Sequence, residues 1–284
     1  TIPCDPSYEA RTPGDRYGHT PAHMEPSAYF SESGDGTFHP TVFSRGPWSV
    51  DSCHAGPPTG LMARASEQLV PDKPLIRLLV EITRPIPMSG FRIGAVVART
   101  GRTVTTTRIE LHDDQRSYAR AEGLHLSEGE IGPIASHHAD VVDPADAVPG
   151  PFPITPRHDE VAFGHSLDVR YVPGMSQGDG GETFMWARAK VPLLDGEEPS
   201  PFQAICPLAD SGNGISWHEG TETMAFVNAD LIVSLHRPPT GEWLGSHTVS
   251  FWEPNGIGRA DAELFDETGP VGRAMQNLVL RRHH

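Results

Sequence analysis

An aspartate followed by a run of small residues, Asp210-Ser211-Gly212-Asn213-Gly214, is the part of the sequence best suited to acid–base chemistry. We expect Asp210 to begin a helix, where unpaired N–H groups and the helix dipole keep a carboxylate ionised. An ionised carboxylate can take a proton from water, and a nearby Gln or Asn amide can hold that water in place. The alternative interpretation is that Asp210 is only a helix cap or turn former.

Other reactive residue types lack a partner at a suitable spacing. Cys53 and His54 are adjacent, and neighbours along a chain do not readily face each other as a nucleophile and its base. A buried Cys53 that serves only packing is the simpler interpretation. His137 and His138, with Asp140 nearby, have no further residue that would complete a metal site with familiar spacing, so we expect no bound metal.

Length and charge narrow the class of protein. The chain has 284 residues, which suits two medium-sized domains, and its formal net charge of -15 disfavours a nucleic-acid surface. No apolar run approaches the roughly 18 residues of a membrane-spanning helix. The first residues lack the basic and apolar regions of a signal peptide, so we expect a cytoplasmic protein.

The chain contains an internal repeat. Three pairs of matching positions are separated by the same distance, since 237 − 84, 263 − 110 and 273 − 120 all equal 153; they are Arg84 and Arg237, Glu110 and Glu263, and Arg120 and Arg273. A period this long is too large for a solenoid repeat and indicates the duplication of a whole domain.

Each repeat has the same predicted order of elements. Residues 59–69 are expected to form a helix, and β-branched stretches separated by turn residues follow it as four strands. One helix followed by a long antiparallel meander predicts a sheet wrapped around a helix. We therefore predict an N-terminal arm (1–28), a first domain (29–127), a linker (128–160) and a second domain (161–284).

Several stretches resemble one enzyme family, the acyl-CoA thioesterases of the thioesterase II type. In the first half these are residues 33–48, the helix from Gly56 to Gln68 and the Arg84-Pro85 strand. In the second half they are CPLADSGNG, HRPPTGEW and the strand that contains Gln276. The resemblance implies an α+β tandem (double) hotdog, with two antiparallel sheets each wrapped around a central helix. It further implies no cofactor, hydrolysis of a fatty acyl-CoA and association of the chains as homo-oligomers, specifically dimers of double hotdogs.

The resemblance also implies a site, because in that family an Asp, a Thr or Ser, and a Gln orient the attacking water. These positions correspond to Asp210, Asn228 and Gln276 in this sequence. Asn228 departs from the pattern, since an amide replaces the hydroxyl. By the offset of 153, the three positions correspond to Pro57, Leu75 and Gly123, which carry no acid, hydroxyl or amide, so we expect one site in the second half.

Two alternatives to a thioesterase stay open. A hotdog hydratase would need an Asp and a His in a segment that the sequence lacks, whereas a non-hydrolytic acyl-CoA or lipid-binding protein would tolerate the change at Asn228. Arg84, Arg102 and Arg108 are weaker candidates for binding the CoA phosphates, because arginine suits phosphate recognition. Ion pairs on the protein surface are the alternative interpretation of these three arginines.

Overall fold

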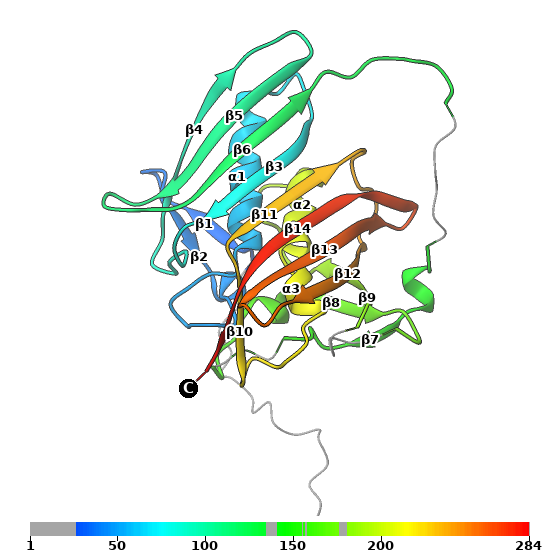
Figure 1. Cartoon of the computed structure of the whole chain (residues 1–284). Helices are drawn as coiled ribbons and strands as arrows, with labels where there is room; N and C mark the ends of the chain where they lie inside the picture. Colours follow the sequence, from blue (N-terminus) through cyan, green and yellow to red (C-terminus); the bar gives the residue numbers. More distant parts are fainter. Residues whose placement is uncertain (1–26, 135–140, 155, 157, 176–180, 284) are drawn as a thin grey trace, which may run out of the picture.

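The computed structural model describes residues 27–134, 141–154, 156, 158–175 and 181–283 (Figure 1). Nearly all of the predicted N-terminal arm, together with His137, His138 and Asp140, lies outside these ranges.

The first half forms one long helix and four main strands. Its elements in chain order are β1 (Phe30–Glu32), β2 (Phe38–Pro40), the 3-10 turn Val42–Ser44, α1 (Gly56–Leu69), β3 (Leu75–Ile82), β4 (Arg92–Arg99), β5 (Val104–His112) and β6 (Ser117–Leu126). The predicted helix at 59–69 is thus confirmed, and it begins three residues earlier. Pro57 and Pro58 occupy its first turn, where the missing N–H groups cost nothing.

The second half contains more strands and two short helices. Its elements are the 3-10 turn Pro144–Asp146, β7 (Val148–Gly150), the 3-10 turn Phe163–Ser166, β8 (Leu167–Tyr171), β9 (Thr183–Ala189), α2 (Pro201–Ala209), α3 (Gly212–Ile215), β10 (Met224–Asn228), β11 (Asp230–Leu235), β12 (Leu244–Trp252), β13 (Ile257–Asp266) and β14 (Gly269–Arg282). Strand β7 falls inside the predicted linker and pairs with β8, so it extends the sheet of the second half.

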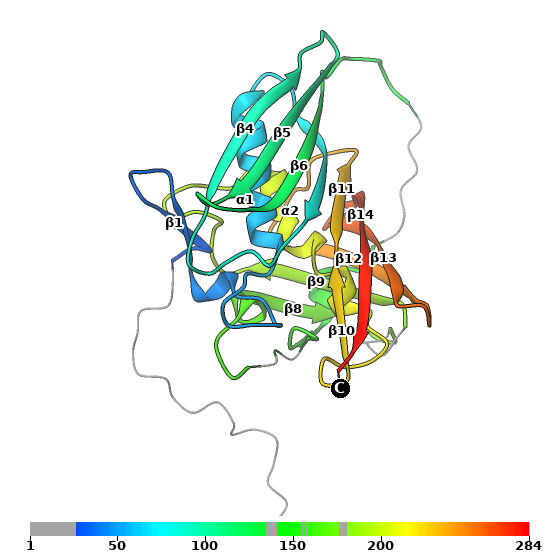
Figure 2. The ribbon, with the colours of Figure 1, turned by 60° about the vertical axis from the view of Figure 1, so that its left-hand side comes forward.

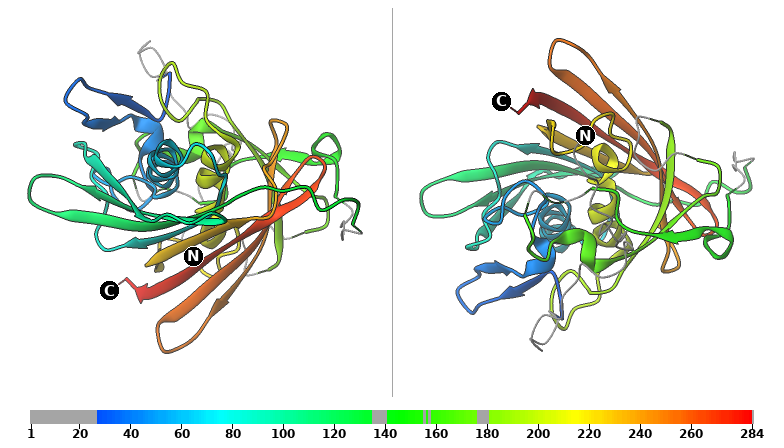
Figure 3. Two further views of the ribbon diagram at one scale, coloured as in Figure 1. Left: turned by 90° about the horizontal axis from the view of Figure 1, so that it is seen from above. Right: turned by 90° about the horizontal axis from the view of Figure 1, so that it is seen from below.

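The two halves share one sheet, whereas the sequence led us to expect two. The strand order is β4-β5-β6-β3-β11-β14-β13-β12-β9-β8-β7, and β10 also pairs with β14, beyond the part of β14 that pairs with β11. The junction is the antiparallel pairing of β3 with β11, which the ribbon shows at the centre of the sheet (Figures 1 and 3). All neighbouring strands in this sheet are antiparallel, and the helices lie together on its concave side (Figure 2).

The junction also reveals a local twofold relation between the halves. In the β3–β11 register, Leu79 lies opposite Ile232, and 232 − 79 = 153. Each of these residues therefore faces its own counterpart in the repeat, as residues on a twofold axis do. Arg84 and Arg237 follow β3 and β11 at equivalent places, as the repeat predicts.

Irregularities in the strands repeat at the same offset. The register shifts between Leu111 and His112 in β5 and between Leu264 and Phe265 in β13, and 264 − 111 = 153. A second shift at residues 75–77 of β3 corresponds to the break between β10 and β11. Because bulges are specific features of a strand pair, their repetition supports a duplication of the whole domain.

The second helix differs from the prediction, because Asp210 ends a helix and does not begin one. Ser200 caps α2 by accepting a hydrogen bond from the Gln203 N–H, and Pro201 fills the first turn, so the helix starts nine residues earlier. Asp210 follows its last residue, and the glycines after it allow only the short α3.

The glycine at position 272 is required where β11 meets β14. A Cβ built on Gly272 would collide with the Ser234 carbonyl oxygen and would lie 2.8 Å from Leu235 Cα. We therefore expect Gly272→Ala to lower the free energy of unfolding by about 1–3 kcal/mol, as overpacking does. Gly34→Ala is the control, since no heavy atom lies within 4 Å of its added Cβ. Equal unfolding midpoints for the two variants in thermal melts would contradict this account of the junction.

Candidate functional site

A buried carboxylate, that of Asp210, lies at the centre of the candidate site. Only 3% of the residue is exposed. Its Oδ1 accepts hydrogen bonds from Asn228 Nδ2 at 2.8 Å and from Gln276 Nε2 at 3.1 Å, while Oδ2 lies 3.0 Å from His54 Nδ1. The structure therefore brings the three residues predicted from the sequence together and adds a histidine to them.

Gln276 on β14 forms hydrogen bonds that link the segment between α2 and α3 to the sheet. Its Nε2 also donates to the backbone carbonyl oxygen of Asp210 at 2.9 Å, and its Oε1 accepts from the Asn213 N–H at 2.9 Å. The side chain is 1% exposed, so these bonds form away from solvent. Gln276 thus fixes both the carboxylate and the backbone that carries it.

Asn228 reaches the carboxylate because of the break between β10 and β11. Asn228 lies opposite Leu278 of β14 and Ile232 lies opposite Met275, so four steps along one strand match three along the other. The extra residue lets Asn228 and the buried Leu231 point to the same side of the sheet, which a regular strand would forbid.

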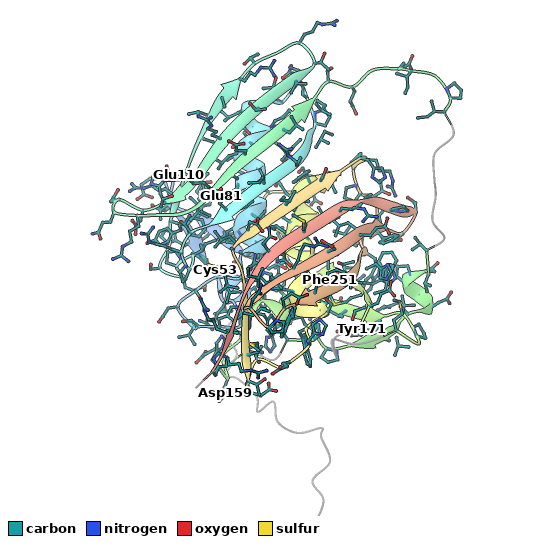
Figure 4. The ribbon with its side chains drawn as sticks, in the orientation of Figure 1. Cys53, Glu81, Glu110, Asp159, Tyr171 and Phe251 are labelled. Carbon is teal, nitrogen blue, oxygen red and sulfur yellow. The ribbon has the colours of Figure 1, made fainter. Side chains whose placement is uncertain are left out.

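His54 comes from the first half, just before α1. Its ring stacks on Phe163 with centroids 4.0 Å apart, and its Nδ1 also faces the Gly56 N–H at 3.2 Å. In the sequence, His54 stands out only as the neighbour of Cys53. In the structure, Cys53 Sγ contacts the Pro87 carbonyl oxygen (Figure 4 labels Cys53).

A signal for His54 was present in the repeat. In a twofold arrangement, counterparts close to the axis lie near one another, and His54 is three residues from Pro57, the counterpart of Asp210. Gly56 shows how close the contact is, because a Cβ there would lie 2.8 Å from Pro207 Cα and 3.1 Å from Asp210 Cβ.

Burial dominates the electrostatics of this pair. Desolvation raises the pKa of Asp210 to about 7, although the bonds from Asn228, Gln276 and the backbone of Ala55 and Gly56 oppose the rise. Desolvation also lowers the pKa of His54. The expectation that a helix N-terminus keeps Asp210 ionised is therefore wrong, because the residue lies at the C-terminal end of α2 and is almost completely buried.

A cavity of about 590 Å³ adjoins His54. It is lined mainly by the chain between β7 and β8 and by apolar side chains; those lining it with His54 include Phe152, Ile154, Phe163, Leu167 and Tyr171. Figure 4 labels Tyr171 on β8. Asp210 does not line this cavity, so among the described residues His54 is the member of the cluster that meets it.

The three arginines proposed for CoA phosphates lie apart from this cavity. Arg84 donates to the Ser117 carbonyl oxygen, and Arg102 occupies the turn between β4 and β5. Arg108 lines a separate hollow on the side of β5 that faces away from α1, near the half-buried Glu110 (labelled in Figure 4). None of the three lines the cavity beside His54.

Within the described ranges, no group of three or more His, Cys, Asp or Glu residues is placed to hold a metal ion. The helices of the described chain are all too short or too polar to cross a membrane.

Comparison with protein families identifies the two halves separately. Residues 44–127 match the acyl-CoA thioesterase N-terminal domain, and residues 142–280 match the acyl-CoA thioesterase C-terminal domain. The chain belongs to the acyl-CoA thioesterase family. This thioesterase is accordingly a thioester hydrolase, and the family match confirms the resemblance found in the sequence. A comparison of the thioesterase with curated proteins found no significant match.

Solved structures share the fold of this thioesterase at low identity. A presumed thioesterase from Novosphingobium aromaticivorans is 17% identical with a TM-score of 0.73, over 89% of this chain and 98% of its own. A hotdog-fold protein from Alicyclobacillus acidocaldarius is 16% identical with a TM-score of 0.68, over 91% and 97%. An acyl-CoA thioesterase II from Mycobacterium marinum is 16% identical with a TM-score of 0.62, over 89% and 95%. The hotdog fold is thus confirmed.

The raised pKa of Asp210 predicts a pH-dependent stability difference. Because the folded pKa of about 7 lies above the unfolded value, the folded state binds the proton more tightly, and wild-type stability falls as the pH rises from about 4 to about 7. Asp210→Asn lacks this fall. The difference in unfolding midpoint between Asp210→Asn and the wild type should therefore be largest at pH 8 and smallest near pH 4. The lowered pKa of His54 makes stability change with pH in the opposite direction, but this contribution is present in both proteins. Asp261→Asn, on the partly exposed partner of Arg259, is the control and should show no such trend.

Proposed function

We propose that this thioesterase hydrolyses fatty acyl-CoA to the free acid and CoA, with Asp210 supplying the basicity that activates water. The observation that carries the proposal is the arrangement of three side chains around the Asp210 carboxylate: Asn228 and Gln276 on Oδ1, and His54 on Oδ2. A carboxyl group with a pKa of about 7 gains and loses its proton near neutral pH, where acid–base catalysis is most efficient.

The mainly apolar cavity beside His54 supports an acyl substrate. Phe152, Ile154 and Leu167 offer hydrocarbon surface, and a volume of about 590 Å³ falls within the usual range for small-molecule sites. Acyl-CoA is therefore the proposed partner, and the proposal requires no metal and no cofactor. We further propose that the chains pair as homo-oligomers, since sheets of this fold expose a long face and two edges.

A binding protein without turnover is the second candidate, and one observation favours it. Both oxygens of Asp210 have partners within the protein, so neither faces the cavity directly. If no group conveyed its basicity to water, the site would hold acyl-CoA without cleaving it. Release of free thiol from a series of acyl-CoA chain lengths distinguishes the two functions.

Replacing the carboxylate should abolish most of the activity. We expect Asp210→Asn to fold and to lose about 100-fold or more in kcat, the usual scale for a general base. In the wild type, kcat should rise with pH and level off above about 7, because only the ionised carboxylate supplies basicity to the site. Thiol release measured from pH 5 to pH 9 tests both points, with Asp261→Asn as the control. Wild-type rates in Asp210→Asn on every acyl-CoA would refute the assignment of Asp210.

Asn228 separates the two candidate functions. In a hydrolase, Asn228→Ala should lower kcat about tenfold or more with little change in acyl-CoA affinity, because it removes a bond that holds the base. In a binding protein whose amide crowds out the water, Asn228→Thr should create or raise activity. Kinetics together with calorimetric binding of acyl-CoA measure both effects. If neither variant changes turnover or binding, Asn228 does not belong to the site.

A further inference from the structure

The position of His54 resolves how a fully partnered carboxylate could act on water. We propose that His54 is the catalytic base of this enzyme, that its Nε2 takes the proton from the attacking water in the adjacent cavity, and that Asp210 is the residue that positions and polarises it from behind. This inference rests on the proposed hydrolysis of acyl-CoA.

The two ring nitrogens of His54 have different surroundings. Nδ1 lies 3.0 Å from Asp210 Oδ2 and 3.2 Å from the Gly56 nitrogen, so it faces the protein interior. Both of these polar contacts of His54 with described residues are made by Nδ1, and the ring lines the cavity of about 590 Å³. An imidazole held at one nitrogen by a carboxylate, with no partner among the described residues at the other, is arranged as a general base.

Packing fixes the ring in this orientation. His54 stacks on Phe163, whose ring centroid is 4.0 Å away, and Phe163 in turn contacts Phe152 edge-on at 5.6 Å. The Asp210 carboxylate is itself held by Asn228 and Gln276. The second half of the chain thus holds the histidine that the first half supplies.

The reaction balances with these groups alone. With Asp210 ionised, Nδ1–H donates to Oδ2, and the Gly56 N–H donates to the same carboxylate in place of Nδ1. The Nε2 lone pair then accepts a proton from water as the water oxygen bonds to the thioester carbon. The tetrahedral intermediate then collapses, the C–S bond breaks, and the Nε2 proton passes to the departing CoA sulfur. The products are CoA thiol and a fatty acid, which releases its own proton to solvent.

Protonation of Asp210 would stop this reaction. A protonated Oδ2 donates to Nδ1, so the ring must carry its proton on Nε2 and can no longer accept one. The other titratable groups around the pair are few. Arg45, His165 and Tyr171 line the cavity, Cys53 precedes His54, and the buried Cys206 on α2 faces Asp210. Burial raises the pKa of both cysteines, so they remain neutral thiols.

The test combines two variants of His54 with a matched control. His54→Gln and His54→Ala should lose about 100-fold or more in kcat with KM changed by less than about threefold. Imidazole added to His54→Ala should restore activity in proportion to its unprotonated fraction, which a merely structural histidine would not allow. His125→Gln is the control, because His125 is likewise a buried histidine, but both of its nitrogens bond to groups other than Asp210, namely the Ser66 hydroxyl and the Lys73 carbonyl oxygen.

The outcomes separate this inference from the proposed function. Near-wild-type kcat in folded His54→Gln, or a loss in His54→Ala that imidazole does not reverse, would overturn the role of His54 and leave the hydrolase intact. A wild-type protein that releases no thiol from any acyl-CoA would instead refute the hydrolase, and this inference with it. Nitrogen NMR of the His54 ring provides a readout besides activity: the Nδ1–H tautomer is expected at pH 8, and an Nε2–H tautomer at that pH would contradict the proposal.

Discussion

The antiparallel pairing of β3 with β11 is the interaction on which the rest of this structure depends. It joins the two halves into one sheet, with Leu79 opposite Ile232 at the local twofold axis. Because the helices of both halves then lie on one side of a shared sheet, the start of α1 meets the end of α2, with Gly56 close to Pro207. Residues from distant parts of the sequence can meet there without any contribution from a second chain.

Stability and chemistry make opposite demands on the carboxylate at this meeting point. Burying a charge is costly, and the rise in the pKa of Asp210 measures part of that cost. The amides of Asn228 and Gln276 offset some of it by donating to Oδ1. What remains is a carboxyl group that changes its charge near neutral pH, which an exposed aspartate does not do. The burial of Asp210 therefore lowers the stability of the fold in return for a reactive carboxyl group.

The sequence alone was sufficient for the strands that belong to the repeat. These strands are rich in β-branched residues and are separated by turn residues, and the constant offset ties each to its counterpart, so β3–β6 and β11–β14 could be recognised. The start of α2 is also marked in the sequence, since Ser200-Pro201 is an ordinary helix-start signal, whereas Asp210 alone does not distinguish the start of a helix from its end. Such signals are local and are readable in principle.

The pairing of the halves and the partners of the carboxylate could not be read in the same way. Whether two duplicated sheets separate or join depends on which edge strands meet, and β3 and β11 carry no local mark of that choice. The contact between His54 and Asp210 spans 156 residues (210 − 54 = 156) and exists only because the helices meet. The raised pKa likewise follows from burial, which is a property of the whole fold.

The twofold relation has a consequence for the history of the chain. Two identical single-domain subunits joined across the same strands would have presented every residue twice, once on each side of the axis. In the fused chain Gly123 stands at the counterpart of Gln276, and the space beside it is taken by the hydroxyl groups of Ser66 and Thr107. After fusion, the first half no longer needed its own copy of the amide, but it kept the segment before α1 that supplies His54. Severing the gene between its halves would therefore yield two pieces, neither of which encodes the whole cluster.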